Sequence, residues 1–279
     1  MIRGVLLGIG GTPFTKVAIR RAVELCRLHN ARLTAVTVVD TARLSRVGAR
    51  PLGASGAALA LREHRVAVTR ESIEESIELL KGTCAEHGVQ VSIQRETGNP
   101  FQLMVDYARY NDVGLFGLRS MFEYDLLGES DVDVADLLSR MVLGGVRPIV
   151  ADADHYREIR RVLIAYGGST RAAESMKTFL RLKPWPDADV RILCCSDSRG
   201  DARRLLSSAA GYCRLHGVEP QVHWAEGPAR ERILAEADAW DADLIVMGTS
   251  RGSVFSRALF GTTALEVIRR ADRALFLGR

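Results

Sequence analysis

The sequence predicts an α/β protein made of two tandem doubly wound domains, each with a mainly parallel five-stranded sheet and helices on both faces. Two observations predict this fold class: the chain repeats itself, and short continuous aliphatic runs alternate with longer segments whose apolar residues are spaced three and four apart. Unalternating aliphatic runs are typical of parallel strands buried on both faces, and the other spacing is that of amphipathic helices. Their alternation predicts a parallel sheet with crossover helices.

The repeat appears as a constant offset between two copies of one pattern. An aliphatic run at 5–9, followed by Gly10-Gly11-Thr12, recurs at 162–166 and is followed there by Gly167-Gly168-Ser169, 157 positions later. Because the strand and its glycine turn recur together, both copies are predicted to have the same fold.

The first copy is longer than the second. Around Cys84 and Cys213 the offset between matching residues falls to 129, so 28 extra residues lie between positions 40 and 84. The stretch from Thr41 to Ala60 has loop composition, and the helical pattern after it is predicted to begin earlier than its counterpart. We predict domains at residues 1–151 and 159–279, joined by a short polar connection.

The composition favours two ordinary globular cores. The chain has 279 residues, 47% hydrophobic and 26% charged, which shows no bias toward disorder. Its net charge of +4 comes from 38 basic and 34 acidic residues, with arginines scattered through predicted helices. No nucleic-acid-binding module accompanies that charge, so we expect a solvated surface of mixed charge and no nucleic-acid partner.

The cysteines and the apolar runs indicate the cellular compartment of the protein. The five cysteines include no Cys-x-x-Cys pair and lie in apolar stretches, so buried free thiols are expected. No apolar run reaches the roughly 20 residues of a membrane-spanning helix, and the chain opens on a strand-like segment instead of a signal core. We therefore expect a cytoplasmic protein with no membrane partner.

In open parallel sheets, ligands bind beyond the carboxyl ends of the strands, where the strand order reverses. One candidate loop follows the first strand of each copy, at Gly10-Gly11-Thr12 and Gly167-Gly168-Ser169. Glycine lets the backbone approach a ligand, and Ser or Thr can cap the next helix. The alternative is a tight turn with a helix cap and no ligand.

The loop after the fourth strand of the second copy is the most informative stretch. Glycines at both ends, several hydroxyls and two arginines suit a backbone nest and helix N-terminus that hold a polyphosphate. The alternative is a surface loop packed by its own apolar side chains. The candidate nucleotide-binding residues of the second domain are Gly167, Gly168, Ser169, Gly248, Thr249, Ser250, Arg251, Gly252, Arg257, Gly261, Thr262 and Thr263.

This order of parts resembles the universal stress protein family over essentially the whole chain, as two copies. ATP-binding members have a loop of Gly, two residues, Gly, nine residues, Gly and then Ser or Thr, after a strand ending in Val-Met-Gly. Val246-Met247-Gly248 and Gly261-Thr262 match both ends of that loop at the right separation. The resemblance implies Rossmann-like domains of the adenine-nucleotide alpha hydrolase-like type, a role in stress response, and binding of ATP or AMP by the second domain, with Mg left open.

The second domain departs from the family pattern in two places. Arg251 stands three residues after Gly248, where the family has glycine, and Gly252 follows one place later. Gly167 stands at the end of the first strand, where ATP-binding members have an acidic residue that contacts the adenine, and Gly10 does so in the first domain. Both departures count against ordinary ATP binding.

The first domain is further from the pattern. Ala135-Asp136 take the place of the terminal Gly and hydroxyl residue, at the end of an acidic segment that starts at Glu123. Such a segment repels phosphate, so this domain is not expected to hold ATP. A solvated loop is the expected use of the acids, since their spacing matches no calcium-loop template.

The sequence offers few candidates for a group of catalytic residues. The histidines have no Ser or Cys partner at a recognised spacing, and the chain has no Gly-x-Ser-x-Gly or His-Glu-x-x-His. Asp40 and Asp197 follow the second strand of each copy, where they are candidates for ligand contacts and where helix capping is the expected use. We expect no catalytic residue and no metal site, and at most a weak ATPase.

The leading hypothesis is a non-catalytic, stress-associated binding or signalling module. The resemblance implies an intramolecular pseudo-dimer whose fifth strands, at 147–151 and 274–278, pair at their edges, while each domain keeps its own sheet. A further homodimer stays open. So do two alternatives: a nucleotide hydrolase or adenylyl-transferring enzyme in which Arg251 or Arg257 stabilises phosphate charge, and a ligand-free interaction protein.

Overall fold

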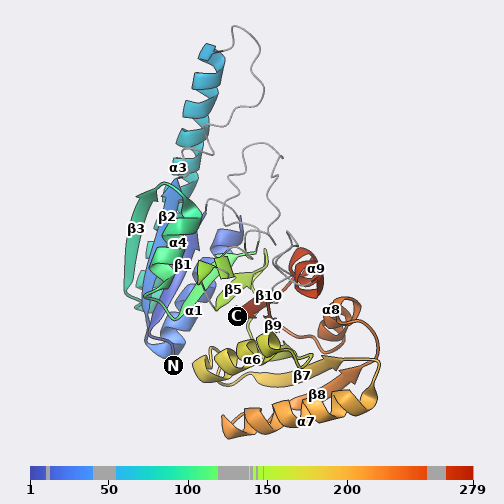
Figure 1. Cartoon of the computed structure of the whole chain (residues 1–279). Helices are drawn as coiled ribbons and strands as arrows, with labels where there is room; N and C mark the ends of the chain where they lie inside the picture. The colour runs from blue at the N-terminus through green and yellow to red at the C-terminus, as the bar shows by residue number, and fades with distance from the viewer. Residues whose placement is uncertain are drawn as a thin grey trace.

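The computed structural model describes residues 1–10, 13–39, 55–118, 138, 141–142, 144–146, 148–249 and 262–278, which form two halves of like construction (Figure 1). The first half comprises β1 (Gly4–Ile9), α1 (Pro13–His29), β2 (Arg32–Val39), α3 (Ser55–His87), β3 (Val91–Thr97), α4 (Pro100–Ala108), β4 (Val113–Gly117) and β5 (Ile149–Asp152). The second comprises β6 (Arg161–Ala165), α6 (Thr170–Leu182), β7 (Asp189–Cys195), α7 (Arg199–Leu215), β8 (Gln221–Ala225), α8 (Ala229–Ala239), β9 (Leu244–Gly248), α9 (Thr262–Arg270) and β10 (Ala274–Gly278).

The ten strands form one sheet in the order β3-β2-β1-β4-β5-β10-β9-β6-β7-β8. Pairing within each half is parallel, and each half is doubly wound, with its first strand between its second and fourth. The two fifth strands, β5 and β10, pair antiparallel with Phe276 opposite Val150, as predicted. That pairing makes the prediction of two separate sheets wrong, because each fifth strand supplies the hydrogen-bonding edge that the other lacks.

Two apolar cores, one on each face of the sheet, run through both halves. On one face, strand residues such as Val5 and Phe276 pack with α1, α3, α6 and α7. On the other face, residues such as Leu6 and Leu275 pack with α4, α8 and α9. Because neither core stops where β5 meets β10, the halves share their buried apolar surface.

An aspartate before the fourth strand of each half makes the repeat visible in atomic detail. Asp112 Oδ2 accepts hydrogen bonds from the backbone amides of Arg3, at 2.6 Å, and Gly4, at 2.9 Å. Asp243 Oδ2 accepts from the amides of Arg160 and Arg161, both at 2.9 Å. The same carboxylate thus fixes the start of the first strand in both copies.

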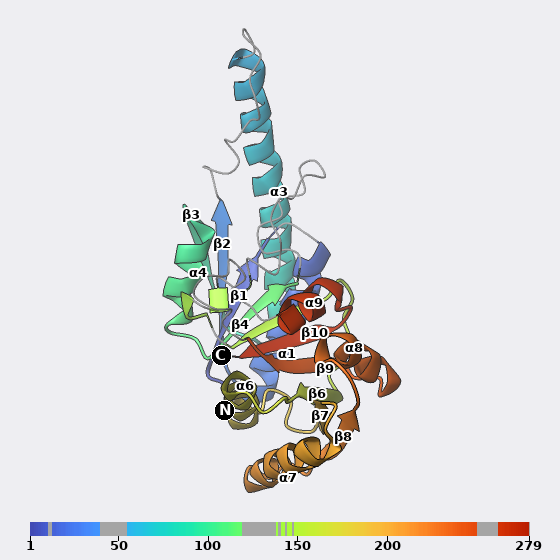
Figure 2. The ribbon, with the colours of Figure 1, turned by 45° about the vertical axis from the view of Figure 1, so that its right-hand side comes forward.

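Helix α3 is the largest difference between the halves. It has 33 residues where its counterpart α7 has 17, and it projects well beyond the sheet (Figures 1 and 2). The predicted early start of this helix is confirmed. Residues 55–60, whose composition indicated a loop, belong to the helix, while residues 41–54 lie outside the described part of the chain.

The cysteines are free thiols, as predicted, and four of the five are buried. Burial raises the pKa of Cys26 to about 12 and that of Cys84 to about 11. Thiols of this kind are scarcely ionised at neutral pH and act as small apolar side chains. In the described part of the chain, no helix is both long enough and apolar enough to cross a membrane.

Candidate functional site

The strand order of the second half reverses between β6 and β9, so the segments that follow these two strands leave the sheet side by side. A Cβ added to Gly248, the last residue of β9, would lie 2.5 Å from the carbonyl carbon of Arg171 and 2.6 Å from the amide nitrogen of Ala172. Both atoms belong to the first turn of α6. The structure therefore brings together two of the places that the sequence singled out.

The glycine turn before α6 combines a cap with an open position. Ser169 is the N-cap of α6, and its Oγ accepts from the Ala172 amide at 3.1 Å, as predicted for this hydroxyl. Gly168 has a φ of +78°, which favours glycine, and a Cβ there would lie 2.8 Å from the Leu205 side chain. A Cβ on Gly167 would meet no atom within 4 Å. Gly167 therefore borders open space at the carboxyl end of β6.

The end of β9 is used to pack the fold. The hydroxyl of Ser175 donates to the carbonyl oxygen of Met247 at 2.9 Å, which holds α6 against the strand. The buried hydroxyl of Thr249 donates to the carbonyl oxygen of Gly278 at 2.9 Å. These contacts give Gly248 and Thr249 structural roles beside any ligand role, and they engage the Thr249 hydroxyl within the fold.

The remaining predicted residues follow Thr249 in the sequence, in the connection to α9 and at the start of that helix. Thr262 is the first residue of α9, and Thr263, the second, is partly buried. The other five lie outside the described residues: Ser250, Arg251, Gly252, Arg257 and Gly261.

Less of the matching region is described in the first half. The carbonyl oxygen of Gly10 accepts from the Thr15 hydroxyl at 3.0 Å, at the start of α1. Gly11, Thr12 and Asp40 lie outside the described residues, as does the acidic segment 123–136.

The prediction that Asp197 caps a helix is wrong. Asp197 is exposed, and the N-cap of α7 is the next residue, Ser198, whose hydroxyl oxygen accepts from the Asp201 amide at 3.3 Å. Ser198 is the N-cap because its hydroxyl oxygen accepts a hydrogen bond from the amide of Asp201, the third residue of α7.

Three of the six histidines make polar contacts within the fold. His223 Nε2 lies 3.0 Å from Glu236, His155 Nδ1 lies 2.8 Å from Asp154, and His29 Nε2 lies 3.0 Å from the carbonyl oxygen of Pro184. Among the described residues, no group of three or more His, Cys, Asp or Glu could hold a metal ion.

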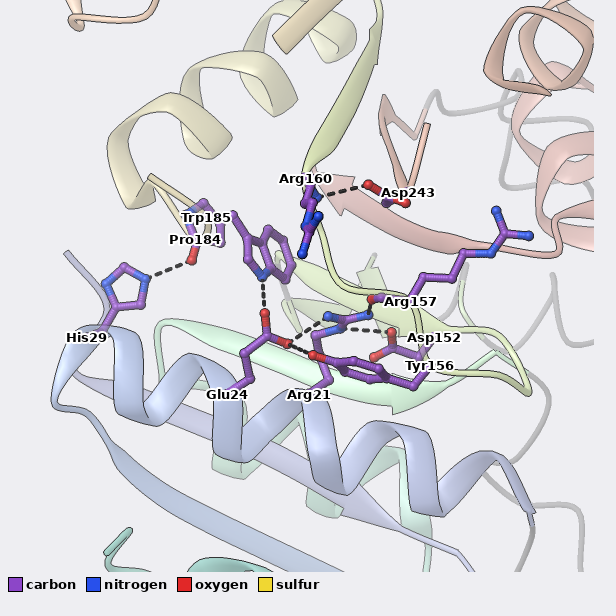
Figure 3. Close-up of polar contacts among 10 residues, drawn as sticks. All are labelled: Arg21, Glu24, His29, Asp152, Tyr156, Arg157, Arg160, Pro184, Trp185 and Asp243. Carbon is purple, nitrogen blue, oxygen red and sulfur yellow. Dashed lines mark hydrogen bonds and ion pairs between the residues drawn. The ribbon is translucent and has the colours of Figure 1, made fainter. Parts of the chain in front are cut away.

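A polar network that joins the halves was not predicted (Figure 3). Arg21 of α1 is 1% exposed, and its Nε donates to Asp152 Oδ1 at 3.1 Å. Glu24, on the same helix, accepts from the Arg21 guanidinium at 2.7 Å, from the Tyr156 hydroxyl at 3.0 Å and from the Trp185 indole N–H at 2.9 Å. Trp185 lies in the second half, so Glu24 contacts both halves directly.

Burial dominates the electrostatics of this network. It raises the pKa of Asp152 to about 6 despite the opposing effect of Arg21, and it raises the pKa of Tyr156. Burial alone would lower the pKa of Arg21, but Asp152 and Glu24 outweigh it and raise that pKa. Asp152 Oδ2 is buried with no hydrogen-bond partner among the described residues. At pH 7.5 the Arg21–Asp152 pair is therefore ionised, and one oxygen of the buried carboxylate lacks a hydrogen bond.

Sequence reasoning placed Asp152 in the polar connection, whereas it is the buried last residue of β5. Its partner Arg21 is 131 positions away, and the partners Glu24 and Trp185 are 161 positions apart. Local pattern carries no information on contacts at that range. The only available signal was an arginine among the apolar positions of α1.

The carboxyl group of Asp152 predicts a pH dependence of stability. Its pKa in the folded chain, about 6, lies above its ordinary value of 3.8, so the folded state holds this proton more tightly than the unfolded state. The contribution to stability is full below pH 4 and is lost as the pH rises through 6, by about 3 kcal/mol in total. Urea unfolding between pH 4 and 7.5, compared with Asp152→Asn, measures it.

The difference in unfolding free energy between the native chain and Asp152→Asn isolates this carboxyl from all others. That difference should shift in favour of the variant as the pH rises from 4 to 7. A difference that stays constant over this range would contradict the pKa assignment.

Each half contributes parallel strands to the sheet, with glycine next to the strand ends where the strand order reverses. This arrangement defines a tandem α/β protein of the Rossmann-like class. A model of the "Universal stress protein family" matches residues 1–115 and 197–276. The chain belongs to the universal stress protein family.

Individual relatives agree with this assignment. The universal stress protein Slr1230 of Synechocystis sp. is 22% identical over 198 residues, which are 69% of this chain and 67% of that protein. A universal stress protein of Archaeoglobus fulgidus has a solved structure that matches with a TM-score of 0.67 at 17% identity, over 99% of this chain and 98% of that one. A functionally unknown protein of Pseudomonas aeruginosa, PA1789, matches with a TM-score of 0.61 at 15% identity, over 99% and 92%. At these identities the solved structures show the shared fold.

Proposed function

We propose that this chain is a non-catalytic binding or signalling module of the stress response whose second half binds an adenine nucleotide, ATP or AMP. The observation that carries the proposal is the meeting of β9 and the first turn of α6 at the switch point, beside the open position of Gly167. Helix N-termini and nearby glycine backbone offer N–H groups and a positive dipole end to phosphate.

Two solved family members are named with adenine nucleotides. One is a universal stress protein in complex with cAMP, and another, from Arabidopsis thaliana, has AMP bound. Those ligands belong to those proteins. Here they decide only which compounds are tested first.

The two ends of the proposed ligand have different support. Phosphate would be held by the backbone near Gly248, by Arg251 or Arg257, and by the start of α9 at Thr262 and Thr263. The adenine end lacks the acidic residue of ATP-binding members, because Gly167 has no side chain. We therefore expect the phosphates to contribute more to affinity than the base does.

The two halves are proposed to act as an intramolecular pseudo-dimer in which only the second carries the nucleotide. The acidic composition of 123–136 in the first half disfavours phosphate there. The antiparallel pairing of β5 with β10 holds the halves as a fixed pair.

Calorimetric titration of the full chain with ATP and AMP, with and without Mg²⁺, tests the nucleotide site. We expect saturable heat from at least one nucleotide, and a loss of about tenfold or more in affinity for Gly261→Asp, because a carboxylate before α9 repels phosphate. Gly200→Asp is the matched control: it adds the same charge to the first turn of α7, where a Cβ meets no atom within 4 Å.

The alternatives give different results in the same experiment. Absence of heat with every nucleotide would overturn the nucleotide site and favour the ligand-free interaction protein. Release of ADP or AMP from ATP above the blank rate would favour the enzyme. Equal affinity in the Gly261→Asp and native chains would place the nucleotide elsewhere.

A further inference from the structure

A hollow of about 610 Å³ lies at the starting ends of β1, β2 and β3 in the first half. The candidate nucleotide site lies beyond the carboxyl ends of strands in the second half, so the two places are separate. The N-terminus marks this end of the sheet in Figure 1, and α3 projects from the opposite end. A volume of this size suits a small organic molecule.

The second half fills the matching place with interlocked side chains. Arg191 donates to Gln221 Oε1 at 2.6 Å, and its guanidinium carbon lies 4.4 Å from the centre of the Trp240 ring. Arg161 donates to the Trp240 carbonyl oxygen at 3.3 Å and to Asp241 Oδ2 at 3.1 Å. In the second half, these side chains therefore contact one another at the starting ends of the strands.

Strand register identifies the counterparts of these residues in the first half. Thr34 lies opposite Leu6 and Ser92, as Arg191 lies opposite Leu163 and Gln221. Small side chains therefore replace the two that interlock in the second half.

Glycine removes a third side chain from the same place. Gly4 lies opposite Arg32, as Arg161 lies opposite Asp189. A Cβ on Gly4 would lie 3.0 Å from Asn111 Oδ1, tighter than ordinary contact. The hollow thus exists because Gly4, Thr34 and Ser92 stand where the second half has two arginines and a glutamine.

Two guanidinium groups border the hollow without partners of their own. Arg3 and Arg32 are exposed lining residues, and within the described part of the chain neither side chain has a hydrogen bond or ion pair. The one acid in the lining, Asp112, already accepts two backbone N–H groups through Oδ2. In the second half, Asp189 replaces Arg32, so the charge at this one position is reversed between the copies.

Neutral polar groups complete the lining. Thr34 and Ser92 contribute hydroxyls, Gln90 contributes an amide, and the 85% exposed Tyr110 contributes a ring and a hydroxyl. Two guanidinium groups beside one hollow can bind an oxyanion through charge-assisted hydrogen bonds, and hydroxyl and amide groups can bind the hydroxyls of the same ligand.

We propose that this hollow binds a small, hydroxyl-rich organic anion of the sugar phosphate or sugar acid class. Arg3 and Arg32 hold the oxyanion, and Thr34, Ser92 and Gln90 meet the hydroxyls. The first half thereby has a ligand site of its own, independent of any nucleotide in the second.

Calorimetric titration with four probes tests this site: glucose 6-phosphate, glucuronate, inorganic phosphate and glucose. We expect glucose 6-phosphate or glucuronate to bind more tightly than inorganic phosphate, and glucose to bind least. Arg32→Asp installs the residue of the second half and should weaken binding by about 10- to 100-fold. The double variant Thr34→Arg with Ser92→Gln grafts the interlocking pair and should abolish binding.

Controls separate this site from a general charge effect and from the nucleotide loop. Arg203→Asp reverses the charge of an exposed arginine on α7 and should bind like the native chain. Binding should also persist in Gly261→Asp. Circular dichroism checks that each variant is folded, and Arg32→Asp, altered at an exposed side chain, stays informative if the double variant does not fold.

Three results would overturn the proposal. They are silence from both sugar anions, native affinity in both hollow variants, and inorganic phosphate binding as tightly as glucose 6-phosphate. The last would remove the role given to the hydroxyl-bearing residues. Stronger binding of glucose 6-phosphate than of glucuronate would support phosphate as the anion, and the reverse would support carboxylate.

Discussion

Replacing Arg21 with alanine is expected to lower the free energy of unfolding by about 3–5 kcal/mol. The change removes the counter-charge of Asp152, whose side chain is only 2% exposed, and leaves Glu24 with two donors instead of three. An unpaired buried carboxylate costs far more than the pair itself contributes. Urea unfolding at pH 7.5, followed by circular dichroism, measures the loss.

Two further variants make this result specific to the buried pair. Arg204→Ala removes an exposed arginine from a surface ion pair and should cost less than about 1 kcal/mol. Arg21→Met combined with Asp152→Leu removes both charges and should recover much of the stability lost in Arg21→Ala. A cost for Arg21→Ala no larger than that of Arg204→Ala would show that the network does not hold the halves together.

Gly248→Ala is expected to destabilise the chain by about 1–3 kcal/mol, although it adds a single methyl group. The new Cβ would lie 2.5 Å from one backbone atom of α6 and 2.6 Å from another, and backbone cannot rotate away as a side chain can. The first turn of α6 must therefore move. Thermal and urea unfolding measure the cost.

Gly211→Ala is the matched control for Gly248→Ala. Gly211 lies within α7, where a Cβ meets no atom within 4 Å, so alanine should leave stability unchanged or raise it by about 0.5–1 kcal/mol. Similar behaviour of the two variants would contradict the close approach of β9 and α6.

The inner strands were predictable from sequence because they are buried aliphatic runs with a counterpart in the other half. The outer strands β3 and β8 are mostly exposed or half-buried and lack that pattern. The β5–β10 pair was also predictable, since both strands end their half at an edge. What it produces, one sheet through both halves, was missed because the halves were treated as separate units. The first turns of α3 were read as a loop because Gly56 and small neighbours resemble one.

The candidate site was predictable to the extent that it depends on local pattern. The Ser169 cap and the adjacency of Gly248 to α6 follow from a glycine turn after one strand and a glycine at the end of its neighbour. The structural use of the Thr249 hydroxyl was not predictable, because its acceptor, Gly278, is 29 positions away. The hollow near Gly4 was missed for a similar reason: it depends on side chains that differ between the two halves and that come together only in the folded chain.

The seam between β5 and β10 has a consequence for assembly. A strand has two sides at which it can form hydrogen bonds, and both sides of β5 and of β10 are occupied within one chain. The chain thus supplies its own partner, and dilution cannot separate the two halves as it separates subunits. Within the described sheet, only the outer strands β3 and β8 have a free side at which a strand of a second molecule could pair, so such pairing would differ from the β5–β10 pairing.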